Sequence, residues 1–374
     1  MTCFSLIRNP AAQFPPVTRL ELTGHAVQSR MLVALSPQKG ITTMARLGVA
    51  LGGGGLSPIE IVDCVKLAEE LGYESAWVVE GHGGDQFSIL TACAVQTKKI
   101  LLGTAISSVF VRSAPTIAMA AACVDYFSNQ RMILGLGSSH KVQVEPEHGI
   151  PYGKPVQRIK DTVAIIRALV RDGVASHHGE TINLERFDLW FTPIRREFPI
   201  YVSAVFPQML ETCGEIAQGT IMVWSNQESG RKAAEHIATG AQRAGRNPKD
   251  IDIVSLLSCS MSENRQEAFE RLRPGAAFYA GFFPRYNRLM AESGFPDAAQ
   301  AIREAWQKGD REGAAKLVPD ALIEALGVAG TPAQCRERIE AYRHSGIALP
   351  IIFPIGSGAN AKHQVMDTLR ACKP

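Results

Sequence analysis

The chain has 374 residues, of which 46% are hydrophobic and 20% charged, and its formal net charge is +3. This composition is typical of a globular protein with a substantial core. So small a charge gives no reason to expect a nucleic acid or an anionic membrane as partner. No run of 18 apolar residues predicts a membrane span. Neither kind of partner is therefore expected, and the cysteine pattern described next favours a cytoplasmic protein.

Eight cysteines are spread along the chain, and no two of them form a Cys-x-x-Cys pair. This spacing favours buried free thiols in a reducing compartment over a disulfide framework or a zinc site. Residues 1–43 contain four basic residues and one acid, with no clear periodicity and no apolar core of a secretory signal. We predict a poorly ordered extension there, and one domain from 44 to 374.

The regular pattern begins with a buried strand at 47–51, followed by Gly52–Gly55 and then Ser57-Pro58-Ile59-Glu60. A serine N-cap, a proline at the first helical position and a glutamate at the third predict a helix that ends near Gly72. Further strands are predicted at 75–80, 100–106 and 131–137. Helices at 86–97 and from about 114 to 127 separate them.

The same alternation continues in the second half of the chain. Helices are predicted at 156–170, 209–218, 228–244 and 331–344, with strands at 199–204, 220–224, 251–257 and 349–353. The segment 172–198 is predicted to be irregular, and 264–326 contains helical patterns without a convincing strand. Eight strands alternating with helices predict an α/β fold, a (β/α)8 TIM barrel with a helical insertion after strand seven.

In such a barrel the functional groups lie where the strands end. The predicted strand ends and the loops that follow them carry Glu80, Asp85, two histidines (His82 and His140) and serines at 107, 108, 138 and 139. The glycine run lacks the Gly-Lys-Ser/Thr of a P-loop, no Gly-x-Ser-x-Gly elbow exists, and the histidines lack a metal-binding spacing. Backbone glycines, hydroxyls and a few acid–base groups suit an organic cofactor that carries the chemistry itself. No metal is predicted.

Several blocks of sequence resemble the luciferase-like flavin and deazaflavin oxidoreductases. The matching blocks are Leu71 to His82, Leu102 to Arg112, Ser128 to Ser139, Pro199 to Ala204, Gly214 to Gly219 and Gly330-Thr331-Pro332. More narrowly, the chain is similar to the methylenetetrahydromethanopterin-reductase-like branch, which uses coenzyme F420. The resemblance implies the barrel described above, and a non-prolyl cis peptide near Ala105–Ile106 that supports the central ring of the cofactor.

The resemblance also implies which residues form the site. The implied catalytic residues are Glu80, His82 and His140, and the implied cofactor-binding residues are Ala105, Ile106, Ser108, Gly137, Ser138, Ser139, Val205, Phe206, Gln208 and Met209. Those around Pro207 would bind the cofactor phosphate. Two departures from the family pattern stand out: Gly81 separates Glu80 from His82, and His140 stands where a sugar-phosphate dehydrogenase branch has a glutamate.

The leading hypothesis is an oxidoreductase that passes a hydride between reduced coenzyme F420 and a small organic substrate, with His82 or His140 moving the accompanying proton. One alternative is an FMN-dependent monooxygenase that uses molecular oxygen, and another is a non-catalytic flavin- or deazaflavin-binding barrel. The resemblance further implies a homodimer. Aromatic residues of the insertion could line a substrate pocket or serve helix packing; they are Phe278, Tyr279, Phe282, Phe283 and Tyr286.

Overall fold

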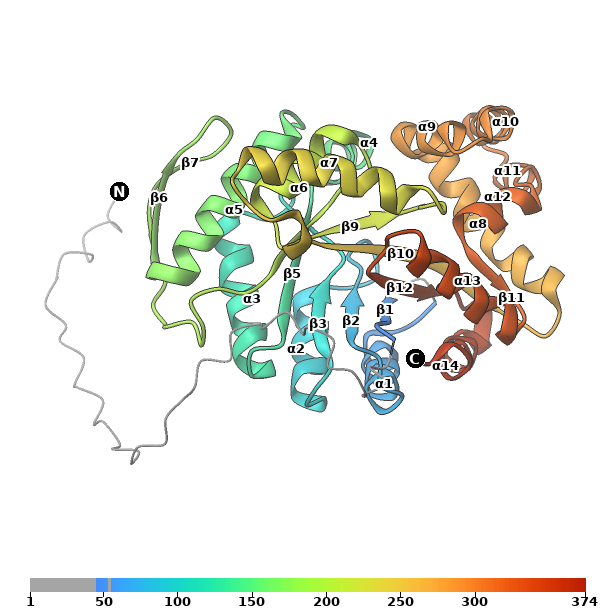
Figure 1. Cartoon of the computed structure of the whole chain (residues 1–374), viewed down its shortest axis with the longest axis horizontal. Coiled ribbons are helices and arrows are strands. Elements are labelled where there is room, and N and C mark those ends of the chain that lie inside the picture. Colours follow the sequence, from blue (N-terminus) through green and yellow to red (C-terminus); the bar gives the residue numbers. More distant parts are fainter. Residues whose placement is uncertain (1–44, 53–54) are drawn as a thin grey trace, which may run out of the picture. The chain divides into compact units, whose positions relative to one another are not determined.

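The computed structural model describes residues 45–374, except 53 and 54. The predicted extension at 1–43 and the middle of the glycine run lie outside the described residues. Eight parallel strands form a barrel (Figure 1), in the order β1 (Gly48–Leu51), β2 (Ser75–Val78), β3 with β4 (Leu101–Thr104, Ser107–Ser108), β5 (Met132–Gly137), β8 (Ile200–Ser203), β9 (Gly219–Val223), β10 (Asp252–Met261) and β12 (Leu349–Pro354). The last strand pairs with both β10 and β1. The barrel is therefore closed, which confirms the predicted fold class.

Helices follow the strands and cover the outside of the barrel (Figure 1). They are α1 (Pro58–Glu70), α2 (Gln86–Gln96), α3 (Ala114–Ser128), α4 (Lys141–His148), α5 (Pro155–Asp172), α6 (Pro207–Ile216), α7 (Ser229–Arg243), α13 (Pro332–His344) and α14 (Ala361–Cys372). Ser57 and Thr331 are each the N-cap of a helix that begins with a full capping box. The capping box at Ser57 was predicted from the sequence. These caps satisfy N–H groups that a helix end otherwise leaves unpaired.

The barrel interior is filled by large side chains, and Trp77 and Ile351 in it are fully buried. A second layer of apolar side chains lies between the strands and the surrounding helices. The interior is thus a packed core, and space for a ligand is expected only at the ends of the strands.

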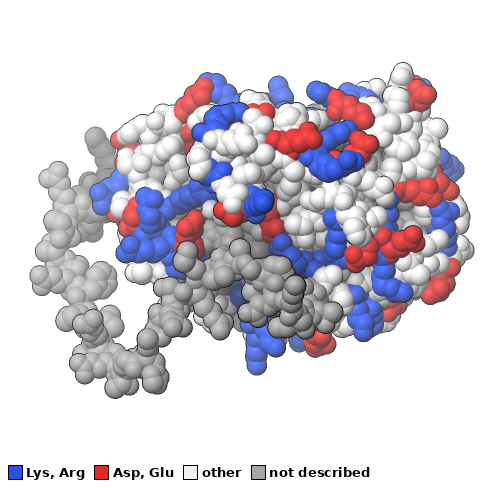
Figure 2. Space-filling view, viewed as in Figure 1, with Lys and Arg blue, Asp and Glu red and all other residues white. Residues whose placement is uncertain are grey.

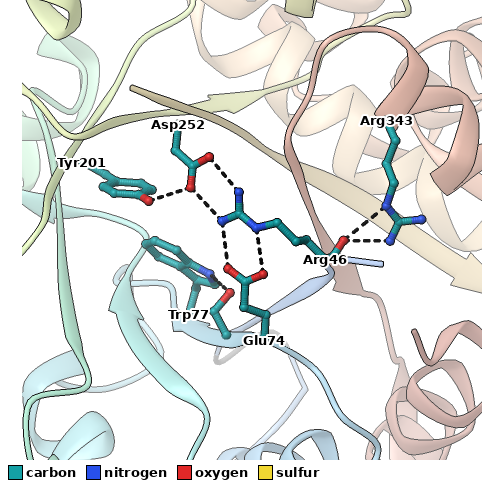
Figure 3. Close-up of polar contacts among 7 residues, drawn as sticks. Arg46, Glu74, Trp77, Tyr201, Asp252 and Arg343 are labelled. Atoms are coloured by element: carbon teal, nitrogen blue, oxygen red, sulfur yellow. Dashed lines mark hydrogen bonds and ion pairs between the residues drawn. The ribbon is translucent and has the colours of Figure 1, made fainter. Parts of the chain in front are cut away.

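An ion-pair network closes the end of the barrel where the strands begin (Figure 3). The Arg46 guanidinium donates to both carboxylate oxygens of Glu74, at 2.8 Å each, and to those of Asp252 at 2.8 and 2.7 Å. Tyr201 donates its hydroxyl to Asp252 at 2.9 Å, and Arg343 donates to the carbonyl of Arg46. Hydrogen bonds to Asp252 and Glu74 raise the pKa of Arg46. The network ties β1, β2, β8 and β10 together at the end opposite the predicted site.

Strand three contains a bulge at its carboxyl end. Gly103 pairs with Ile133, and Ser107 pairs with Leu136, so four residue steps on one strand face three on the other. One extra residue is accommodated between β3 and β4, where the peptide bond Ala105–Ile106 is cis, as the resemblance implied. Gly135 is required beside the bulge, because a Cβ there would collide with the carbonyl oxygen of Thr104. Bulges of this kind re-aim side chains next to binding sites.

Some elements differ from the sequence prediction. The segment predicted to be irregular contains an antiparallel hairpin, β6 (Val174–His178) with β7 (Asn183–Asp188). Its side chains are mostly exposed, so alternation between apolar and polar residues was not available as a signal. The loop after β5 contains α4, whose internal Pro146 obscured the helical pattern. The short strand β11 (Val328–Gly330) and the last helix, α14, were not predicted either.

The insertion after β10 consists of α8 (Arg265–Phe282), α9 (Pro284–Glu292), α10 (Pro296–Gln307), α11 (Arg311–Lys316) and α12 (Asp320–Leu326), which have an apolar cluster of their own. Within the described residues, no helix is both long and apolar enough to cross a membrane. Figure 2 shows Lys and Arg side chains interspersed with Asp and Glu over the visible face, in keeping with the small net charge.

Candidate functional site

An apolar wall lies where the strands end. The side chain of Ile106 covers Gly137, because a Cβ at residue 137 would lie 2.5 Å from Cγ1 and Cδ1 of Ile106. Ile106 is half-buried and packs on the barrel interior together with Val79 and Phe353. Ala105 is buried beside it. Glycine at 137 therefore leaves room for the isoleucine side chain, which forms an apolar surface at the mouth of the barrel.

Hydroxyl groups border this wall. Ser108 pairs with Gly137, whose Cβ position faces Ile106 at the barrel interior, so the Ser108 side chain lies on the inner face of the barrel. Its oxygen accepts from the N–H groups of Phe110 and Val111 at 3.3 and 3.4 Å, which fixes its position. Ser138 and Ser139 follow at the end of β5 and are half-buried, and Ser139 adopts a left-handed conformation with φ of 51°. The backbone thus fixes the Ser108 hydroxyl beside the wall, and two further serines directly follow Gly137.

Glu80, two residues beyond β2, is held in an ion-pair network. Its Oε1 accepts from Nη2 of Arg112 at 2.6 Å, and its Oε2 accepts from the side-chain amide of Gln86 at 2.7 Å. The same guanidinium also pairs with Asp85, the N-cap of α2. Partial burial opposes ionisation of Asp85, but hydrogen bonds from Ser88 and Arg112 lower its pKa. The network gives Glu80 a fixed orientation, with 18% of its side chain exposed.

His140 lies between the barrel and the insertion. It is the N-cap residue of α4, and its ring is 4.5 Å from the ring of Phe283 and 4.9 Å from that of Tyr286, centroid to centroid. Burial lowers the pKa of His140 to about 4, and the positive charge of Arg285 contributes in the same direction. His140 is therefore a neutral imidazole at neutral pH, able to donate or accept a hydrogen bond.

His82 has a different environment, although it belongs to the same end of the barrel. Its Nε2 lies 3.1 Å from Oε2 of Glu147 in α4, and 80% of its side chain is exposed. The structure thus connects both predicted histidines to α4, with His140 at its start and Glu147 in its last turn. His140 is enclosed by aromatic rings, whereas His82 is in contact with solvent.

The loop around Pro207 begins α6 in a way that suits an anion. Phe206 is the N-cap and provides no side-chain cap, while Pro207 occupies the first helical position. Val205 and Phe206 are half-buried, Gln208 is exposed and Met209 is buried. The guanidinium of Arg288, from α9, lies 5.5 Å above the Phe206 ring. Backbone N–H groups and a nearby cation at a helix N-terminus fit a phosphate.

The aromatic residues of the insertion contact the barrel mouth as well as one another. Tyr279 packs against Trp224 at the end of β9, with ring centroids 5.1 Å apart, and Phe283 and Tyr286 reach His140. Phe278 remains 40% exposed. The structure thus shows this cluster packed among the helices of the insertion and against the barrel mouth. Its lining of a substrate pocket stays a prediction.

Sequence reasoning missed the arginines that complete this region. Arg112 ends a block that the resemblance includes, but its pairing with Glu80 depends on two loops that meet only in the fold. Arg285 and Arg288 lie in the insertion, where no motif marks them. An apolar wall, the bordering hydroxyls and a helix start without a side-chain cap together fit a planar ring that carries a phosphate tail.

Comparisons with known proteins identify the family. The sequence profile of the family described as luciferase-like monooxygenase matches residues 38–349. A 5,10-methylenetetrahydromethanopterin reductase from Archaeoglobus fulgidus is 31% identical over 299 residues, which cover 78% of this chain and 89% of the relative.

Solved structures give the same fold. The coenzyme F420-dependent tetrahydromethanopterin reductase from Methanopyrus kandleri has a TM-score of 0.78 and 26% identity, covering 88% of this chain and 98% of that chain. An F420-dependent secondary alcohol dehydrogenase, solved with an F420–acetone adduct, has a TM-score of 0.71 at 18% identity and covers 89% of this chain and 100% of that one. At that identity the second likeness concerns the fold alone.

Proposed function

This chain belongs to the luciferase-like monooxygenase family, and we propose on that premise that it is an oxidoreductase that transfers a hydride between reduced coenzyme F420 and a small organic substrate. The observation that carries the proposal is the wall of Ile106 on Gly137, placed between fixed hydroxyls and the uncapped start of α6. The name of the similar reductase from Methanopyrus kandleri includes coenzyme F420, which supports F420 as the cofactor.

In this proposal the wall formed by Ala105 and Ile106 supports the ring of the cofactor. Ser108, Gly137, Ser138 and Ser139 border that ring, and the N–H groups of the Val205–Met209 loop hold its phosphate. When bound, the deazaflavin supplies or accepts the hydride. Glu80, fixed by Arg112, orients the loop beside the ring.

Two histidines have distinct proposed roles in proton movement. His140, neutral because of its burial, hydrogen-bonds the substrate group that gains or loses a proton. His82, paired with Glu147 and exposed, exchanges protons with solvent. A well-placed general acid or base contributes roughly 10² to 10⁴ in rate, so loss of the productive histidine should mainly lower kcat.

The cofactor assignment is tested by titrating the purified protein anaerobically with F420 and with FMN while following tryptophan fluorescence. Trp224 lies at the mouth, 7% exposed, and should report binding, so Trp224→Phe serves to assign the signal. We expect F420 to bind at least about tenfold more tightly than FMN, a difference of about 1.4 kcal/mol.

Turnover is then measured with reduced F420 over a panel of ketones, imines and activated alkenes. His140→Ala should reduce kcat with little change in cofactor affinity, whereas His178→Ala, in the exposed hairpin, should have no effect. Tighter binding of FMN with consumption of oxygen would instead establish a monooxygenase. Cofactor binding without turnover across the panel would favour the non-catalytic barrel.

A further inference from the structure

Three cysteines that are far apart in the sequence meet at one point outside the barrel interior. Cys259 is on β10, Cys335 on α13 and Cys372 on α14, elements that lie together in Figure 1. Their exposed fractions are 0%, 0% and 2%, and the three sulfur atoms all lie within 4.8 Å of one another. The sequence predicted no metal site because no pair of cysteines has a ligand spacing.

We propose that Cys259, Cys335 and Cys372 form a binding site for one soft, thiophilic cation, and that Cu(I) is the ion this ligand set favours. The proposal concerns the layer between the barrel and its last two helices, and it does not depend on the cofactor or the substrate at the barrel mouth.

The spacing of the sulfur atoms fits a three-coordinate ion. A metal–sulfur bond of about 2.3 Å places three sulfurs in a trigonal arrangement about 4.0 Å apart, since the separation is the bond length times the square root of three. The observed upper limit of 4.8 Å requires each sulfur to move by well under 1 Å, within the range of a small change in side-chain torsion.

The kind of ligand selects the kind of ion. All three donors are thiols, and soft thiolate ligands favour Cu(I), zinc and iron–sulfur clusters over hard cations. Structural zinc is almost always four-coordinate. Among the described residues no histidine, aspartate, glutamate or further cysteine joins the group as a fourth ligand. A three-sulfur site enclosed by protein therefore suits Cu(I) better than zinc.

Positive charge lies next to the cluster. A metal binds thiolates, so three buried thiols must lose protons, and an adjacent cation makes this easier. Arg336, one residue after Cys335, donates to the carbonyl of Ala371 at 2.8 Å and so brings its guanidinium beside Cys372. A positive charge at this place would attract electron-rich thiolate ligands. Cys372 is the last residue of α14, and fraying of that helix end provides a route for the ion.

Packing alone explains a buried cysteine elsewhere in this protein. Cys93 and Cys213 are each fully buried, and neither belongs to such a group among the described residues. Free cysteine behaves there as a small apolar side chain. These two thiols provide matched controls, because they are as buried as the cluster but are not grouped with other metal-binding side chains.

The test is an anaerobic titration of the reduced full-length protein with Cu(I) buffered by a competing chelator, with native mass spectrometry to count bound ions. We expect one tightly bound Cu(I), and a loss of apparent affinity of more than about 100-fold in Cys259→Ser and Cys335→Ser. Cys93→Ser and Cys123→Ser, which alters an exposed thiol, should bind as the unmodified protein does.

X-ray absorption of the copper-loaded protein keeps the proposal testable if a serine variant fails to fold. Three sulfur ligands at about 2.2–2.3 Å are expected. Nitrogen or oxygen ligands, equal binding by the cluster variants and the controls, or more zinc than copper retained in competition would each overturn the proposal.

Discussion

The environment of His140 makes a quantitative prediction about stability and pH. Burial between Phe283 and Tyr286, together with the charge of Arg285, lowers the pKa of His140 to about 4 in the folded protein, whereas an unfolded chain has a histidine pKa of about 6.5. The unfolded state therefore binds more protons between these two values. As the pH falls through this window, the free energy of unfolding must decrease.

The size of the effect follows from the two pKa values. Between about pH 7.5 and about pH 5, the unfolded histidine takes up nearly a full proton while the folded one remains neutral, and at about 1.36 kcal/mol per pKa unit the stability lost is about 2 kcal/mol. Glutamine at position 140 does not titrate. The variant His140→Gln should therefore lack this part of the pH dependence, whatever other groups contribute.

The assay is urea unfolding of the unmodified protein, His140→Gln and the control His178→Gln at both pH values. Between the two pH values the unmodified protein and the control should each lose about 2 kcal/mol more than His140→Gln. The same loss in all three proteins would refute the reasoning, because it would mean that His140 takes up its proton in the folded state.

Three further predictions concern other parts of the molecule. Gly137→Ala should weaken cofactor binding, because the new methyl group displaces the Ile106 side chain that covers this position, and overpacking of this kind costs about 1–3 kcal/mol. Fluorescence titration measures the cofactor affinity. The control Gly153→Ala, which has open space around residue 153, should bind the cofactor normally. Arg112→Met should release Glu80 and lower kcat by roughly 10²-fold, the size of effect expected when a group near the reacting atoms is misplaced. Arg112→Lys should recover part of the activity. Unaltered steady-state kinetics in Arg112→Met would remove this ion pair from the mechanism. Arg46→Met should lower the free energy of unfolding by about 1–3 kcal/mol, because it leaves two partly buried carboxylates without their arginine partner. Cofactor affinity should stay unchanged. A change in cofactor affinity would contradict the separation between the two ends of the barrel.

The elements that the sequence predicted well are those whose signals are local. The capping box at Ser57 and the apolar runs of the eight barrel strands depend on neighbouring residues, and the structure has all of them. The hairpin around His177 lacked alternation because both of its faces are largely exposed. Pro146 concealed a short helix by interrupting its pattern.

The candidate site also has parts that the sequence could predict and parts that it could not. Ile106, Gly137 and the loop at Pro207 could be located from the order of the strands, since each lies at or just after a strand end. Distant pairings could not be predicted. The enclosure of His140 by Phe283, and the convergence of sulfur atoms from β10, α13 and α14, depend on tertiary packing that no local pattern records. Whether the predicted site residues act as proposed stays a prediction.

The ion-pair network at Arg46 has a consequence for how the chain folds during synthesis. Arg46 precedes the first strand, but its partner Asp252 lies 206 residues later, at the start of the seventh. At roughly 5–20 residues per second, a ribosome needs about 10–40 s to produce the intervening chain. The other edge of the first strand pairs with β12, which is made later still, so for all of that time the first strand has only its second-strand neighbour. The nascent barrel is then an open sheet, exposed to chaperones and to aggregation until its last third emerges.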